Sequence, residues 1–341
     1  MNHAKKTLLI IIAVIVVILG VYSQNFLGTY YTKQSNTPAS GSVVYIENGV
    51  SGVVTVTDPY LNRSTDINVL YDPLDSGSGF IVNSNGYIVT AFHVVGDPVS
   101  IQNLGKLKLM DSADVQLYLE RAAVTGYISK YDPQLGTSLT SNGSSSSPVI
   151  QNQPDVNATT DIMVQRNLLQ VKSSQQQIKV RLPGSTNGDS INADLIDVGD
   201  AATSEDVAII KIDGLFKKLN PLTLNSKKPA TNDNIQIFGY PVNNQEMYSS
   251  SDPSPLQPSS SSGVVTNELP NQGSVYFETT APTVHGFSGG PVVDKNNNVL
   301  GIIIYSIVSS NNSQQSGSSV FLSSDYIIQI CNRNNVSTSI V

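Results

Sequence analysis

The sequence has little cysteine and histidine, and fewer basic than acidic residues. Of its 341 residues, one is cysteine and three are histidine, and 19 lysines and arginines are outnumbered by 26 aspartates and glutamates, for a formal net charge of −7. The single cysteine, Cys331, excludes a disulfide framework and a cysteine-based metal site. Its apolar surroundings near the C-terminus predict a buried small hydrophobe rather than a nucleophile. With a pI near 4.9 and no basic stripe to neutralise phosphates, the composition argues against nucleic acid as a partner.

The chain opens with a basic and then apolar segment. Lys5 and Lys6 precede an unbroken apolar run over residues 8–22, an order typical of an export signal whose N-terminus stays in the cytoplasm. The run is shorter than the roughly 20 residues of a comfortable membrane span. We favour a retained transmembrane anchor over residues 1–23, and secretion after cleavage near residues 21–23 is the alternative. In either case the remainder, from a polar linker at 24–41 onward, is predicted to lie outside the cytoplasm, which a surface rich in Ser and Asn with only 13% charged residues also favours.

From residue 42 the pattern is that of a β protein. Short β-branched runs at 43–46 and 53–56 are separated by turn residues, and Asn85-Gly86 between two apolar runs is the strongest short-range signal for a hairpin. Further strands are predicted at 177–182, 191–198, 207–212 and 234–241, and a capped helix at 323–331 closes the chain. A double-barrel β protein would account for most of this length.

The β pattern lapses between about residues 101 and 174. Helices are predicted at 111–124 and 160–172, around a Ser/Asn/Pro-rich stretch at 131–154. We interpret this block as a partly helical insertion that is too short and too polar to form a second core.

A glycine-rich stretch around Ser288 is the best candidate for a site of chemistry. Gly286, Gly289 and Gly290 would let the backbone approach a substrate closely, but a serine hydroxyl attacks only when a base takes its proton. Of the three histidines, His3 precedes the apolar segment on the cytoplasmic side, whereas His93 follows the predicted hairpin. A glycine-rich hairpin without catalytic function is the plain alternative for this stretch, as a structural histidine is for His93.

An acid completes the set of candidates. Asp206 directly precedes the buried run 207–212, and Glu205, Asp200 and Asp213 compete with it for the role. The chain order histidine, aspartate, serine is that of the chymotrypsin-type triad.

Four sequence blocks resemble the HtrA/Deg branch of the trypsin-like serine proteases, in the order found in that family. They are residues 77–81, 86–90 with 93–95, 205–212, and 287–293 with 299–302, and the similarity extends in segments over about residues 42–335. The resemblance implies two six-stranded antiparallel β-barrels of the chymotrypsin type, with the site in the cleft between them. It divides the chain into a first barrel at 42–213, with the insertion at about 101–174, and a second barrel with the closing helix at 214–341.

The resemblance also assigns roles to residues. It implies that His93 is the general base, Asp206 its orienting acid and Ser288 the nucleophile, with the backbone amides of Gly286 and Ser288 as the oxyanion hole. The substrate-binding strand would contain Ile304, Tyr305 and Ser306; because it has no acid, a small or aliphatic side chain is expected before the cut bond. The resemblance implies no cofactor and no metal.

Three features depart from that family. The interval between His93 and Asp206 is far longer than its compact spacing, so the insertion should project from the first barrel as a lid or an oligomer contact. The chain ends soon after the closing helix, so no PDZ domain is expected. His285 occupies a position where the family does not require histidine; it lines the oxyanion loop, lines the substrate pocket, or is an ordinary loop residue.

Two functions compete. The first is a membrane-anchored serine endopeptidase that acts outside the cytoplasm on unfolded or exposed proteins, in protein quality control, as a monomer or a homo-oligomer. The second is a catalytically silent binding or scaffold protein on a protease fold.

Overall fold

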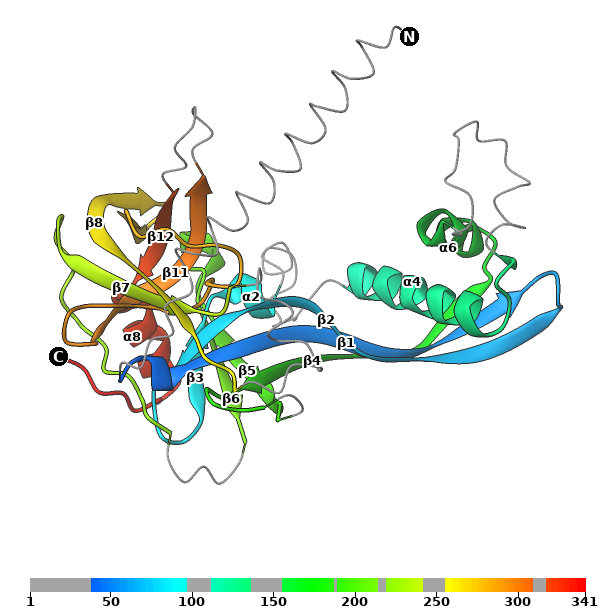
Figure 1. Cartoon of the computed structure of the whole chain (residues 1–341), viewed down its shortest axis with the longest axis horizontal. Coiled ribbons are helices and arrows are strands. Elements are labelled where there is room, and N and C mark those ends of the chain that lie inside the picture. Colours follow the sequence, from blue (N-terminus) through cyan, green and yellow to red (C-terminus); the bar gives the residue numbers. More distant parts are fainter. Residues whose placement is uncertain are drawn as a thin grey trace, which may run out of the picture.

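The computed structural model describes residues 38–96, 112–135, 155–186, 189–213, 219–241, 255–308 and 317–341, and places their strands in two closed six-stranded barrels (Figure 1). All the neighbouring strands pair antiparallel. The prediction of an all-β chain with two barrels of the chymotrypsin type is confirmed.

The first barrel has the strand order β1-β2-β3-β6-β5-β4. The predicted hairpin at Asn85-Gly86 joins β2 to β3, with Ile81 opposite Ile88. All six strands lie within residues 42–213: β1 (Val43–Asp58), β2 (Arg63–Ile81), β3 (Tyr87–Thr90), β4 (Leu169–Arg181), β5 (Ile191–Val198) and β6 (Ala208–Ile212).

The second barrel has the order β10-β11-β12-β9-β8-β7 and lies within residues 214–341. Helix α8 (Ser324–Arg333) follows its last strand and begins where the Ser323 side chain accepts a hydrogen bond from the Asp325 amide, as the capping pattern predicted. Its strands are β7 (Asn234–Gly239), β8 (Ser259–Asn271), β9 (Ser274–Thr279), β10 (Pro291–Val293), β11 (Val299–Val308) and β12 (Gly317–Ser323).

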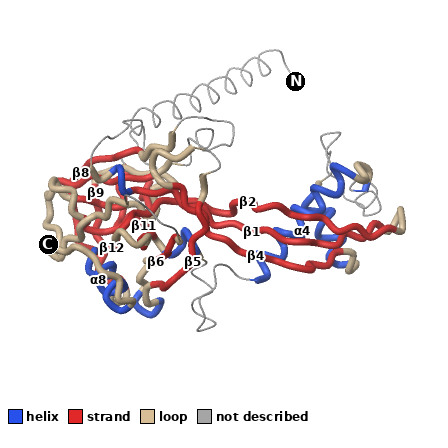
Figure 2. Tube along the Cα trace, turned by 90° about the horizontal axis from the view of Figure 1, so that it is seen from below, coloured by secondary structure: helices blue, strands red, loops and turns tan. Residues whose placement is uncertain are grey.

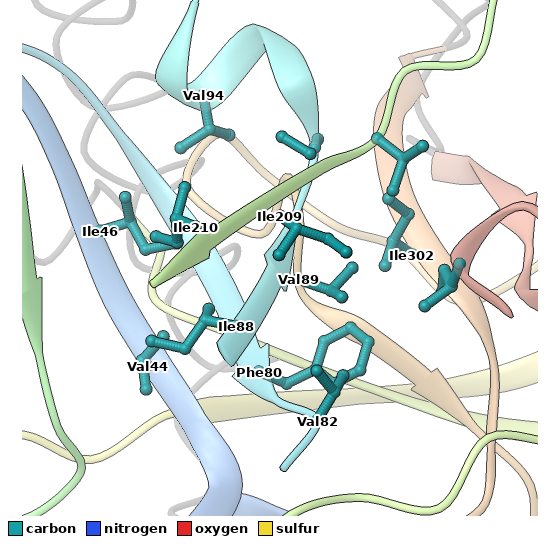
Figure 3. Packing of buried hydrophobic residues seen from close by; sticks show 14 of the residues in the cluster. Val44, Ile46, Phe80, Val82, Ile88, Val89, Val94, Ile209, Ile210 and Ile302 are labelled. Carbon is teal, nitrogen blue, oxygen red and sulfur yellow. The ribbon is translucent and has the colours of Figure 1, made fainter. Parts of the chain in front are cut away.

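One apolar core extends across both barrels. Figure 3 shows Phe80, Val89 and Ile209 inside the first barrel with Ile302 of the second beside them, and all four are fully buried. A separate cluster that includes Phe277, Phe287 and Phe321 fills the rest of the second barrel. Because the cores meet, the two barrels are fixed against each other at the cleft where the site is expected.

The first barrel continues on one side into a long arm. β1, β2 and β4 run well past the barrel as a three-stranded sheet (Figures 1 and 2). Helix α4 (Ser112–Lys130) covers one of its faces, and helix α6 (Val156–Gln165) packs against α4 (Figure 1). Val54, Leu119, Tyr127 and Met163 are fully buried between the helices and the sheet.

The arm corrects three predictions. The insertion was expected to lack a core, yet valines of the sheet and one face of α4 supply an apolar cluster distinct from that of the barrels. Residues 43–46 and 53–56 were expected to be separate strands, but β1 is continuous, because bulges at Asn48/Gly49 and Val50/Gly52 absorb the residues that looked like a turn. The second predicted helix starts earlier, at Val156, because the Asp155 side chain caps it, and residues from 169 form a strand instead.

The predicted membrane segment at 1–23 and most of the linker at 24–41 lie outside the described residues. In the described part of the chain, no helix combines the length and the apolar character needed to cross a membrane.

Candidate active site

His93 and Asp206 meet because of one strand pair. β3 and β6 are antiparallel with Thr90 opposite Ala208, so the end of β3 and the start of β6 lie at the same edge of the barrel. His93 follows β3 in the short helix α2 (Phe92–Val95), and Asp206 precedes β6. Asp206 Oδ2 lies 2.6 Å from His93 Nδ1, and its Oδ1 accepts a hydrogen bond from the His93 backbone amide at 3.0 Å. The carboxylate thus holds both ring and backbone, and it favours the tautomer protonated at Nδ1, which leaves Nε2 as the basic nitrogen.

The other acids considered for this role are engaged elsewhere. Glu205 accepts a hydrogen bond from the Asp200 amide at 3.0 Å, Asp200 caps the short turn that follows it, and Asp213 forms an ion pair with Lys211. Of the four candidates, the structure brings Asp206 to the histidine.

The surroundings of His93 favour its charged form. Burial by itself would lower the pKa of His93, but the hydrogen bond to Asp206, the charge of Asp206 and the charge of Asp75 outweigh it and raise the pKa above the usual 6.5. His93 is therefore neutral, and able to accept a proton, only above this raised pKa.

Ser288 lies in the loop between β9 and β10, which packs against the first barrel beside the histidine. Gly289 has a φ of +79°, and a Cβ at this position would lie 2.7 Å from the Ala91 amide nitrogen, so a larger residue does not fit. A Cβ on Gly77 would meet the Val94 side chain at 2.6 Å and the Ser288 carbonyl oxygen at 3.0 Å. The loop thus meets the first barrel at residues that flank the histidine.

The hydroxyl of Ser288 donates a hydrogen bond to the Ile304 carbonyl oxygen at 3.2 Å. Within the described ranges, no hydrogen bond joins Ser288 to His93. The structure therefore brings His93 and Asp206 into direct contact and places Ser288 at the same edge of the barrel, with its hydroxyl turned toward β11.

Two backbone amides of this loop are candidates for oxyanion donors. Among the residues that the structure describes, neither the Gly286 amide nor the Ser288 amide has a hydrogen-bond acceptor, whereas the Phe287 amide between them donates to the Val284 carbonyl at 3.1 Å. Backbone amides without an acceptor of their own are the kind of donor that stabilises an oxyanion.

Comparison with known families decides the assignment of this fold. A family model described as a trypsin-like peptidase domain matches residues 77–302, which is more than half of the chain. The chain belongs to this family. The matched region contains His93, Asp206 and Ser288. A search of curated proteins found no match. The narrower resemblance to the HtrA/Deg branch stays a prediction.

The strand expected to bind substrate in this trypsin-like peptidase is β11. Ile304 is buried, Tyr305 is half exposed, and the strand pairing with β12 shifts register between Ile303 and Tyr305. None of the side chains from Ile304 to Ser306 is acidic.

Sequence reasoning missed a group of hydroxyls beside this strand. Thr283 Oγ1 lies 2.7 Å from Ser306 Oγ and 2.8 Å from Ser319 Oγ, and Ser319 in turn donates to the Ala281 carbonyl at 2.7 Å. Thr283 and Ser319 are buried. The only signal in the sequence was that Thr283 lies five positions before Ser288, in the same loop.

His285 lies at the surface, next to the amide of Gly286. Its side chain is 66% exposed, and its Nε2 is 3.6 Å from Asp75 Oδ1 on β2. Asp75, which sequence reasoning did not identify, thus lies near both histidines of the site. His285 joins the loop before Ser288 to the first barrel.

The described residues contain no group of three or more His, Cys, Asp or Glu side chains placed to hold a metal ion. Cys331 is buried in α8, and burial raises its thiol pKa to about 12, so it is not a nucleophile at neutral pH.

Proposed function

We propose that this trypsin-like peptidase is a serine endopeptidase that acts through His93, Asp206 and Ser288. The observation that carries the proposal is that Asp206 binds His93 twice. Its Oδ2 lies 2.6 Å from His93 Nδ1, and its Oδ1 accepts a hydrogen bond from the His93 backbone amide at 3.0 Å. A histidine oriented in this way beside a glycine-bounded serine loop fits proton transfer from a nucleophile.

The reaction begins when the Ser288 hydroxyl turns away from the Ile304 carbonyl toward His93. His93 Nε2 accepts the hydroxyl proton as Ser288 Oγ bonds to the carbonyl carbon of the peptide, and the new oxyanion accepts hydrogen bonds from the Gly286 and Ser288 amides. His93 then gives its proton to the leaving amine, the C–N bond breaks, and an ester with Ser288 remains. Water attacks this ester with His93 again as base, which releases the acid and restores the serine.

The set of hydroxyls beside β11 supports a preference for substrates with a small side chain before the cut bond. A carboxylate that would select lysine or arginine is absent from Ile304 to Ser306, and Thr283 with its serine partners presents only neutral hydroxyls there. A small neutral side chain needs no counter-charge in such surroundings, whereas a large cation would lose its water without gaining one.

The sequence supports a particular cellular setting for this reaction. Lys5, Lys6 and the apolar run at 8–22 support a single-pass anchor with the peptidase outside the cytoplasm, and secretion after cleavage is the alternative. The HtrA/Deg resemblance supports unfolded or exposed protein segments as substrates, a role in protein quality control, and either a monomer or a homo-oligomer.

Degradation of an unfolded casein by the protein without residues 1–37 tests the proposal. We expect cleavage by the wild-type protein, with small residues before the new ends, and none by Ser288→Ala or His93→Ala. Fragments of the same pattern from Ser288→Ala would exclude the proposal.

A catalytically silent binding protein is the second candidate, and the bond from the Ser288 hydroxyl to the Ile304 carbonyl favours it. It predicts that the wild-type protein and Ser288→Ala bind unfolded casein equally and that neither cuts it.

A further inference from the structure

Ser78, on β2, is fully buried, and each of its polar groups has a partner. Its amide donates to the Ser288 carbonyl at 2.8 Å, and its carbonyl accepts from Thr90 Oγ1 at 2.7 Å. Its hydroxyl oxygen lies 2.9 Å from the Tyr240 amide nitrogen and 2.6 Å from the Gly286 carbonyl oxygen.

The direction of the two hydroxyl bonds is fixed by chemistry. A backbone amide can only donate and a carbonyl can only accept, so Ser78 Oγ accepts from Tyr240 and gives its one proton to Gly286. Ser78 thus connects three segments: its own strand in the first barrel, the end of β7 in the second barrel, and the loop that carries Ser288.

These bonds set the orientation of the peptide unit between Gly286 and Phe287. Ser78 holds its carbonyl end, and the Val284 carbonyl holds its N–H end at 3.1 Å. With this plane fixed, the amides on either side of it, those of Gly286 and Ser288, are the ones without acceptors among the described residues. If the carbonyl of Gly286 lost its partner, the peptide could rotate and direct an oxygen where an oxyanion must bind.

We propose that the Ser78 hydroxyl is a positioning residue that orients the Gly286–Phe287 peptide and so keeps the two oxyanion amides directed into the site. The inference rests on the proposed hydrolase function. Ser78 touches no reacting atom, so its effect should appear in the transition state and not in substrate binding.

The test compares Ser78→Ala with Ser324→Ala. Ser324 is equally buried and donates to the Asn225 carbonyl at 2.5 Å, so it loses the same kind of bond away from the site. Loss of a single oxyanion donor lowers kcat by about 10²–10³. We expect Ser78→Ala, which disturbs such a donor indirectly, to lower kcat by about 10- to 100-fold with KM within about two-fold. Ser324→Ala should leave both unchanged.

A second measurement distinguishes a loss of oxyanion positioning from a general loss of order in the site. A peptidyl trifluoromethyl ketone, which forms an oxyanion on Ser288, should bind Ser78→Ala more weakly by the factor lost in kcat. The matching peptide amide, which forms none, should bind as it does to the wild type. Equal weakening of both ligands, or a loss of kcat no larger than that of Ser324→Ala, would overturn the inference. If Ser78→Ala does not fold, Ser78→Cys keeps the volume with a weaker donor and is measured in its place.

Failure of the proposed hydrolase function can be told apart from failure of the positioning role of Ser78. If the wild-type protein neither cleaves nor binds the ketone, the hydrolase assignment fails, and crystal structures of the wild type and Ser78→Ala decide the positioning. A rotated Gly286–Phe287 peptide in the variant supports it, and an unchanged peptide overturns it.

Discussion

The two halves of the site are held in place by different means. His93 and Asp206 are joined by two hydrogen bonds that follow directly from the pairing of β3 with β6. Ser288 depends on contacts between the barrels, on the close approach of Gly289 to the first barrel and on the bonds from Ser78. The base and its acid are thus fixed by local strand register, whereas the nucleophile is fixed by the way one barrel packs on the other.

The largest effect should come from removing either half. We expect Ser288→Ala and His93→Ala each to lower kcat by about 10⁶, and the double variant to be no worse, because the two act as one unit. Steady-state kinetics on a peptide cut by the wild type gives the three values. If the loss of kcat in the double variant equalled the product of the two single losses, Ser288 and His93 would act independently, which would contradict the proposal.

Asp206→Asn should cause the next largest loss of kcat. An amide in place of the carboxylate cannot hold the Nδ1-protonated tautomer, so we expect kcat to fall by about 10⁴. Glu205→Gln is the matched control, since Glu205 binds the neighbouring turn instead of the histidine, and should stay within a few-fold of the wild type. Similar losses in both variants would contradict the assignment of Asp206.

A smaller effect should follow from Asp75→Asn. The Asp75 charge raises the pKa of His93, so its removal lowers that pKa, and the acidic limb of kcat/KM against pH moves to lower pH. His285→Gln removes the contact between His285 and Asp75 but leaves the Asp75 charge, so the acidic limb of this variant should not move to lower pH. If the acidic limb of the pH profile did not move in Asp75→Asn, a role for the Asp75 charge at the site would be excluded.

The arm should have the least effect on catalysis. Leu119→Ala empties a fully buried position between α4 and the sheet and should lower the free energy of unfolding by about 2–5 kcal/mol, with kcat/KM within about two-fold. Leu70, on the same arm, is 81% exposed, so Leu70→Ala should leave stability unchanged in the same denaturant titration. A ten-fold loss of kcat/KM in Leu119→Ala would instead couple the arm to the site.

The sequence indicates the contact between His93 and Asp206 better than it indicates the contacts that hold the Ser288 loop. His93 after a hairpin and Asp206 before an apolar strand are local signals, and one strand pair is enough to join them. The bond between Ser78 and Gly286 links residues 208 positions apart, so no local pattern predicts it. The sequence likewise suggested a turn between residues 46 and 53, where pairing with β2 and β4 on either side instead keeps one continuous, bulged strand. The core of the arm was missed because its valines and the apolar face of α4 are individually sparse and meet only in the folded chain.

The central claim is that Ser288, activated by His93, is a nucleophile. Labelling with a fluorophosphonate, followed by intact mass and peptide mapping, tests it most directly. We predict a single adduct on Ser288 of the wild-type protein, none on Ser288→Ala, and strongly slowed labelling of His93→Ala. An unlabelled wild type, an adduct that persists in Ser288→Ala, or an undiminished rate in His93→Ala would contradict the claim.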